Sequence, residues 1–203
     1  MSSSVVSSDS HACLAVFNLL LGCTSVCSGT GDGSLITGIG EDAASNVSEW
    51  SLHYKNDNGK FVNYTKQSGI KGNYFSLSAT WWDYDYDNAP DIYVSNDFLG
   101  PDMLYKNSGK GTFTDTIKST VPHTPWFSMG TDVADVNNDG LFDFMGSDMA
   151  GSDHYKSKMG MGDMEKDIWF LTTSNPRQYM RNALYLNAGS GRFLEAAFLT
   201  GLA

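Results

Sequence analysis

Short apolar and aromatic runs alternate with polar turns from about residue 50 to residue 203. Trp81-Trp82, Ile92-Tyr93-Val94 and Phe144-Met145 are such runs, and Gly, Asn and Asp gather between them. β-Branched and aromatic runs bounded by turn residues are typical of β-strands. The pattern therefore predicts an all-β chain built from antiparallel hairpins.

One hairpin pattern, a strand followed by an Asn/Gly turn and a second strand, occurs three times, at residues 52–61, 104–113 and 184–193. A unit of about 50 residues with several short strands has the period of a β-propeller blade. A closed propeller has about 4–8 blades. We therefore predict a partial propeller, an incomplete ring with two full blades, the start of a third and a degenerate blade near 31–33. The remaining blades would belong to a longer chain, and closure by oligomerisation is the alternative.

Two acidic segments, 83–91 and 135–143, share the pattern D-x-[DN]-x-D-x-x-x-D. Ca²⁺ takes about 6–8 oxygen ligands in flexible geometry, and crowded carboxylates repel one another without a counter-ion. We therefore predict one Ca²⁺ in each segment, although acidic turns without metal are the alternative. The predicted ligands are side chains, with backbone carbonyls at the apolar seventh positions: Asp83, Asp85, Asp87, Ala89, Asp91, Asp135, Asn137, Asp139, Leu141 and Asp143.

An EF-hand starts with the same spacing but differs in two respects. Its twelfth loop position should be Glu, whereas Val94 and Gly146 stand there in this chain. Its loop also lies between helices, whereas strand-like runs flank both acidic segments. The segments are therefore predicted to be strand–loop–strand connections.

These features resemble the FG-GAP/VCBS repeats, Ca²⁺-loop blades also found in integrin α-subunit heads. The closer resemblance is to bacterial secreted proteins of the ASPIC/UnbV type, which are related to cartilage acidic protein. It rests on Ser128-Met129-Gly130, the segment 135–143 and the hairpin 182–193, and it covers about residues 50–203. In the first segment Asn88 replaces the loop Gly, and Asn tolerates the left-handed conformation. The resemblance implies a Ca²⁺-dependent propeller that binds or scaffolds and does not catalyse.

Composition and motifs narrow the function. The net charge of −10 and the isoelectric point of about 4.6 argue against nucleic-acid binding, which requires basic patches. The four histidines are isolated, and no H-E-x-x-H, G-x-S-x-G or Walker A pattern occurs. We predict a non-enzymatic, exported module that binds or scaffolds an extracellular protein or glycan. The alternative is the non-catalytic part of a larger secreted carbohydrate-active enzyme.

The N-terminal region predicts export. Residues 12–22 form an apolar run of signal-peptide length, and Leu20-Leu21-Gly22-Cys23 resembles a bacterial lipobox with Cys23 as the lipid-bearing residue. Residues 1–11 contain no Lys or Arg, which leaves an ordinary buried strand or a wrongly assigned start codon as the alternatives. No segment reaches the roughly 20 apolar residues of a membrane span. The predicted organisation is a signal peptide at 1–22, a Ser/Gly-rich linker or degenerate blade at 23–50, and propeller blades at 51–203, located extracellularly or at the cell surface.

A Met-rich insertion interrupts the repeat at about residues 147–182. It is predicted to contain a short helix that begins at Asp163. The thioethers of Met159, Met161 and Met164 suggest a soft-metal site, but the interpretation we favour is that flexible Met side chains pack the insertion onto the blade.

Overall fold

The computed structural model describes residues 17–18, 23–24, 35–40, 50–58, 60–71, 74–97, 100–149, 151 and 174–203. Most of the predicted signal peptide lies outside these residues. So do the predicted helix at Asp163 and most of the Met-rich insertion.

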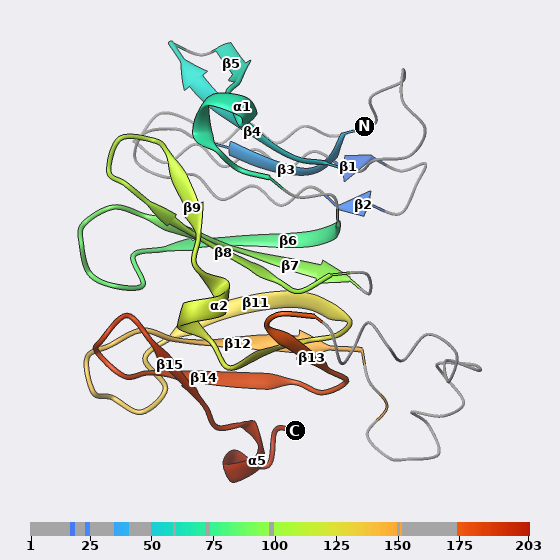
Figure 1. Cartoon of the computed structure of the whole chain (residues 1–203), viewed down its shortest axis with the longest axis vertical. Helices are drawn as coiled ribbons and strands as arrows, with labels where there is room; N and C mark the ends of the chain where they lie inside the picture. The colour runs from blue at the N-terminus through green and yellow to red at the C-terminus, as the bar shows by residue number, and fades with distance from the viewer. Residues whose placement is uncertain are drawn as a thin grey trace.

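Two four-stranded antiparallel sheets form the centre of the molecule (Figure 1). The first blade consists of β6 (Phe75–Trp82), β7 (Asp91–Asp97), β8 (Met103–Asn107) and β9 (Phe113–Asp115). The second blade consists of β11 (Ser128–Ala134), β12 (Asp143–Asp148), β14 (Ala183–Asn187) and β15 (Phe193–Glu195). The prediction of a partial, propeller-like all-β fold is confirmed.

Smaller elements flank the two blades. β3 (Leu35–Gly40), β4 (Trp50–Asp57) and β5 (Lys60–Asn63) form a three-stranded sheet, and β1 (Phe17–Asn18) pairs with β2 (Cys23–Thr24). β10 (His123–Pro125) and β13 (Arg177–Tyr179) form a parallel pair. Three one-turn helices are present in the described residues: α1 (Thr65–Ser68), α2 (Ile117–Thr120) and α5 (Ala197–Thr200).

The third hairpin completes the second blade and does not open a new one. β14 pairs with β12, with Tyr185 opposite Phe144, as β8 pairs with β7 in the first blade, with Tyr105 opposite Ile92. The insertion therefore lies inside the second blade, between β12 and β14. Our prediction of a third blade starting at this hairpin was wrong, because spacing along the chain does not show which strands pair across an insertion.

The short helices were not predicted outside the insertion. Each follows the last strand of a sheet, whose final residue accepts a backbone N–H two positions later. The acceptors are Asn63 Oδ1 (3.0 Å), Asp115 Oδ1 (3.0 Å) and Glu195 Oε1 (2.7 Å). Such local side-chain bonds compete with a continuing strand and turn the backbone into a helical turn.

Successive residues of β7 bury both faces of the first blade. Tyr93 points towards the second blade, where its ring lies 4.9 Å from that of Phe144. Ile92 points to the opposite face and belongs to a separate cluster with Phe113, whose ring lies 5.6 Å from His53 of β4. Because side chains alternate along a strand, one buried strand joins the first blade to both neighbouring sheets.

Asp102 is a fully buried carboxylate that links the two blades. Its Oδ2 accepts hydrogen bonds from the hydroxyls of Tyr93 (2.6 Å) and Ser128 (2.7 Å), and its Oδ1 accepts one from the backbone N–H of Asn96 (2.8 Å). Burial raises the pKa of Asp102 to about 7, against the lowering effect of these three donors. The carboxylate is therefore a pH-sensitive part of the contact between the blades.

We expect Asp102 to make the fold less stable as pH rises. Below the ordinary carboxyl pKa of about 3.9 the group is protonated in both states. Between that value and about 7 the unfolded chain ionises while the folded chain keeps the proton, so the free energy of unfolding falls. Urea unfolding at a series of pH values should show this decrease in the wild type and a smaller one in Asp102→Asn. Ser128→Ala keeps the Asp102 carboxyl, so its free energy of unfolding should fall with pH as in the wild type. If Asp102→Asn shows the same decrease as the wild type, Asp102 is not the group responsible.

Candidate metal centre

The two acidic segments form equivalent loops. Loop 1 (residues 83–91) joins β6 to β7, and loop 2 (residues 135–143) joins β11 to β12, both at the same edge of the sheets (left in Figure 1). The backbone is left-handed at the fourth and sixth positions of each loop. The φ values are 61° at Tyr86, 67° at Asn88, 60° at Asn138 and 87° at Gly140. The prediction that Asn88 supplies the conformation of the loop Gly is confirmed.

The carboxylate of the first aspartate in each loop accepts two backbone N–H groups from later positions of the same loop. Asp83 accepts backbone N–H bonds from Asp87 (3.0 Å) and Asn88 (2.8 Å). In loop 2, Asp135 accepts the corresponding bonds from Asp139 (3.1 Å) and Gly140 (3.0 Å). One side chain therefore satisfies two N–H groups that the tight turn cannot pair in a ladder.

The ninth aspartate of each loop anchors the loop to the next hairpin. Asp91 is fully buried, and its two oxygens accept the backbone N–H groups of Tyr84 (3.2 Å) and Asn107 (2.7 Å). Asp143 makes the same two bonds to the loop and to the Asn187 N–H (2.8 Å). Sequence analysis gave these aspartates only a metal-binding role, whereas the structure gives each one a structural role as well.

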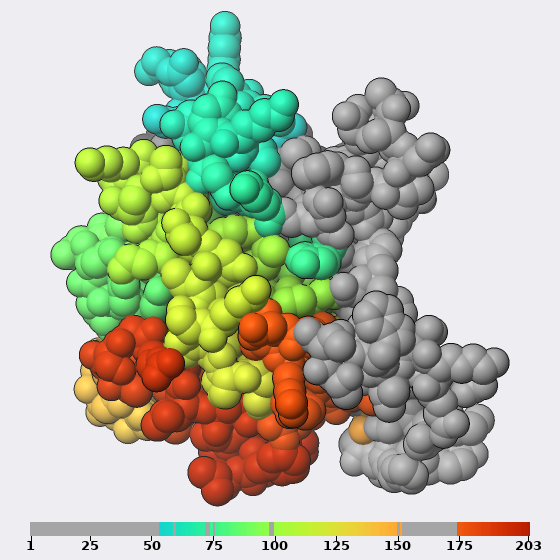
Figure 2. Space-filling view, viewed as in Figure 1, coloured from blue at the N-terminus to red at the C-terminus, as the bar shows by residue number. Residues whose placement is uncertain are grey.

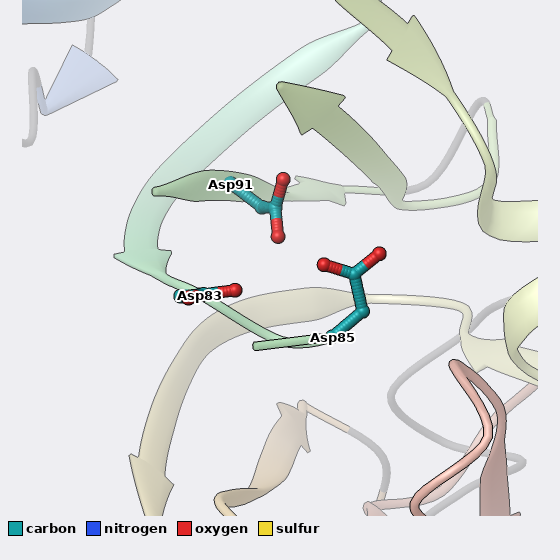
Figure 3. Close-up of side chains that lie close together, drawn as sticks. All are labelled: Asp83, Asp85 and Asp91. Carbon is teal, nitrogen blue, oxygen red and sulfur yellow. The ribbon is translucent and has the colours of Figure 1, made fainter. Parts of the chain in front are cut away.

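Three carboxylates of loop 1 converge. Oxygens of Asp83, Asp85 and Asp91 lie within 4.8 Å of one another, and the side chains face a common space (Figure 3). Asp85 Oδ1 is buried and has no hydrogen-bond partner among the described residues. A cluster of hard oxygen atoms with one unsatisfied member fits a divalent cation such as Ca²⁺. These residues could therefore hold a metal ion.

The raised pKa of Asp91 also favours a cation in loop 1. Burial raises the pKa of Asp91 to about 7, against the lowering effect of its two N–H donors, and the neighbouring charges of Asp85 and Asp87 raise it further. Placing several carboxylates together in a partly buried loop disfavours their ionised forms. A cation among them would remove that penalty.

The other predicted ligands take different positions. The carboxylate of Asp87 lies 3.1 Å from Lys106 Nζ and accepts the N–H of Ala89. In loop 2, Asn137 and Asp139 bond to each other at 2.9 Å, and Asp139 accepts the N–H of Leu141. Within the described chain, the loop 2 carboxylates do not form the tight cluster seen in loop 1. The ligand roles of these residues stay predictions.

Tyr86 connects the two loops, a contact that sequence analysis missed. Its hydroxyl accepts the Phe142 N–H (2.6 Å) and donates to the Gly140 carbonyl (3.4 Å). Its ring also stacks on that of Phe142, with 6.5 Å between centroids and 5° between planes. The aromatic pair at the fourth position of one loop and the eighth of the next is the only signal in the sequence.

His123 belongs to no catalytic motif in the sequence, but in the fold it lies beside two charged side chains. Its Nε2 lies 3.0 Å from Glu195 Oε2 and 2.8 Å from Arg181 Nη2, and burial lowers its pKa. The imidazole and the carboxylate are both largely buried. The three groups join β10 to β15 and stabilise the connection between the blades.

Residues 83–145 match the FG-GAP-like repeat. The matched segment contains both acidic loops, the hairpin of the first blade and the connection to the second. FG-GAP-like repeats are typically non-catalytic structural modules. No curated protein matches the chain. None of the helices in the described part of the chain is long and apolar enough to cross a membrane.

The left-handed sixth position gives a direct test of the loop geometry. A Cβ added at Gly140 would meet no atom within 4 Å, so only the backbone conformation opposes a side chain there. Gly140→Ala should therefore lower the free energy of unfolding by about 1–2 kcal/mol. Asn88→Gly, at the equivalent position of loop 1, should change stability by no more than a few tenths of a kcal/mol. Chemical denaturation measures both, and a neutral Gly140→Ala would contradict the loop geometry.

Proposed function

We propose that this chain is a Ca²⁺-binding, exported propeller segment that serves as a binding or scaffold module for an extracellular protein or glycan at the cell surface. The observation that carries the proposal is the convergence of Asp83, Asp85 and Asp91, in which one buried oxygen of Asp85 has no hydrogen-bond partner in the described part of the chain. The FG-GAP-like repeat in the same segment supports a binding module.

Ca²⁺ would act by closing the loops that join the strands. Loop 1 would hold the ion with Asp83, Asp85, Asp87, Asp91 and the carbonyl of Ala89. Loop 2 would hold it with Asp135, Asn137, Asp139, Asp143 and the carbonyl of Leu141. Aspartates at the ninth positions are bonded to the next hairpin, so a bound ion would fix two strand connections of one blade at once. The role of the ion in this proposal is structural.

Apolar side chains of the second blade are exposed where the equivalent side chain of the first blade is buried, which supports a scaffold with a further blade. In the first blade Tyr84 is 4% exposed, because it packs against Phe193 and its carbonyl accepts a hydrogen bond from Asn187. The equivalent residue of the second blade, Val136, is 52% exposed. Phe198 is 71% exposed and belongs to α5, the helix at the lower end of the molecule (Figure 2). A further blade of the same kind would cover this face.

Removal of Ca²⁺ should destabilise the protein. The ion binds the folded loops and not the unfolded chain, so at 100 times its dissociation constant it should add about 2.7 kcal/mol per site. Differential scanning calorimetry with Ca²⁺ and with chelator should show the difference. Asp139→Ala should reduce both Ca²⁺ affinity and melting temperature, whereas Asp132→Ala, an exposed aspartate on β11, should leave the Ca²⁺ response intact. An identical melting temperature with and without Ca²⁺ would mean that the loops are acidic turns.

Export is tested separately from metal binding. Expressed in a bacterium with its own N-terminus, the protein should appear outside the cytoplasm without residues 1–22. Intact-mass spectrometry should then show a chain that begins at or near Cys23, with added lipid if Cys23 is acylated. A soluble cytoplasmic product that retains residues 1–22 would contradict the proposal.

A further inference from the structure

We propose that Lys106 is the built-in counter-ion of loop 1, and that its ammonium group sets how tightly this loop binds a divalent cation. Lys106 lies on β8, beyond the loop in sequence, and its Nζ is hydrogen-bonded to Asp85 Oδ2 and lies 3.1 Å from Asp87 Oδ2. The inference rests on the proposed function, because it concerns the affinity of the same loop.

The second blade has neither member of this ion pair. Tyr105 and Tyr185 occupy equivalent registers in β8 and β14, so the residue equivalent to Lys106 is Leu186. The third loop position, Asp85 in loop 1, is Asn137 in loop 2. The extra carboxylate and the extra ammonium therefore occur together in one blade and are both absent from the other.

The charge of the two sites is the same as a result. Loop 1 has four carboxylates and one adjacent ammonium, which gives −3. Loop 2 has three carboxylates and, among the residues that the structure describes, no paired ammonium, which also gives −3. Blades with the same loop backbone thus reach the same charge by different residues. This equality indicates that the lysine compensates for Asp85.

The two oxygens of Asp85 have different surroundings. Oδ2 is bonded to Lys106, whereas Oδ1 is buried and has no partner among the described residues. The ammonium therefore occupies one side of the carboxylate and leaves the other available to an ion. The side chain of Lys106 is 37% exposed and that of Asp85 is 15% exposed, so the lysine approaches the cluster from the solvent side.

Two opposite consequences follow. Without metal, Lys106 offsets the repulsion among four carboxylates and stabilises loop 1. With metal, a divalent ion bound through Asp85 would lie within about 5 Å of the ammonium, and their repulsion weakens binding by about tenfold even in a water-like dielectric. Lys106 thus lowers both the need of loop 1 for Ca²⁺ and its affinity for it.

The test uses the full chain with loop 2 disabled by Asp139→Asn, so that loop 1 alone reports. In this background Lys106→Leu, which copies Leu186, is compared with Lys110→Leu, which removes the same charge from the exposed tip of the same hairpin. Calorimetric titration with Ca²⁺ should show about tenfold tighter binding for Lys106→Leu and less than about a twofold change for Lys110→Leu. In chelator, Lys106→Leu should have a lower melting temperature than the Asp139→Asn parent, whereas Lys110→Leu should not.

A charge-restoring variant checks the cause. Asp85→Asn combined with Lys106→Leu reproduces the residues of the second blade and should return the melting temperature in chelator to that of the parent. Unchanged or weaker Ca²⁺ binding by Lys106→Leu would overturn the inference and leave the proposed function standing. If neither the parent nor the variants bind Ca²⁺, the proposed function fails. If, in addition, Lys106→Leu has the same melting temperature in chelator as the parent, Lys106 does not stabilise loop 1 and the inference is overturned as well.

Discussion

One buried carboxylate at the start of the second strand holds each blade together at its loop end. Asp91 and Asp143 each accept one N–H from their own loop and one from the turn of the following hairpin. Three consecutive strands therefore meet at a single side chain. Because both carboxylates are fully buried, each must be satisfied by several donors or neutralised by a cation.

This constraint explains the other acidic residues of the loops. In loop 1 the first aspartate satisfies the N–H groups of the turn, and Asp85 at the third position brings further oxygen atoms close to the buried carboxylate. The resulting negative charge needs compensation. In loop 1, Lys106 compensates part of the negative charge. In loop 2, the charge is lower because Asn137 stands where loop 1 has an aspartate. A divalent cation would complete the compensation in both.

The parts of the fold predicted from the sequence are those set by local pattern. The hairpins, the strand–loop–strand form of the acidic segments and the left-handed Asn88 follow from turn chemistry and alternation. The partner of β14 was not predictable, because the insertion separates it from β12 and only spatial pairing identifies it. The one-turn helices depend on single side-chain bonds such as that of Asp115 to the Ile117 N–H. The Lys106–Asp85 pair spans 21 positions, although comparing the blades residue by residue would have revealed it.

In the proposed function, one cation closes each of the two loops. Crystals grown in Ca²⁺ and examined by anomalous diffraction test it most directly, because the signal locates and identifies each ion. We expect one Ca²⁺ peak in loop 1 among Asp83, Asp85 and Asp91, and a second in loop 2 beside Asp135 and Asp143. Well-ordered loops without an anomalous peak at saturating Ca²⁺ would contradict it.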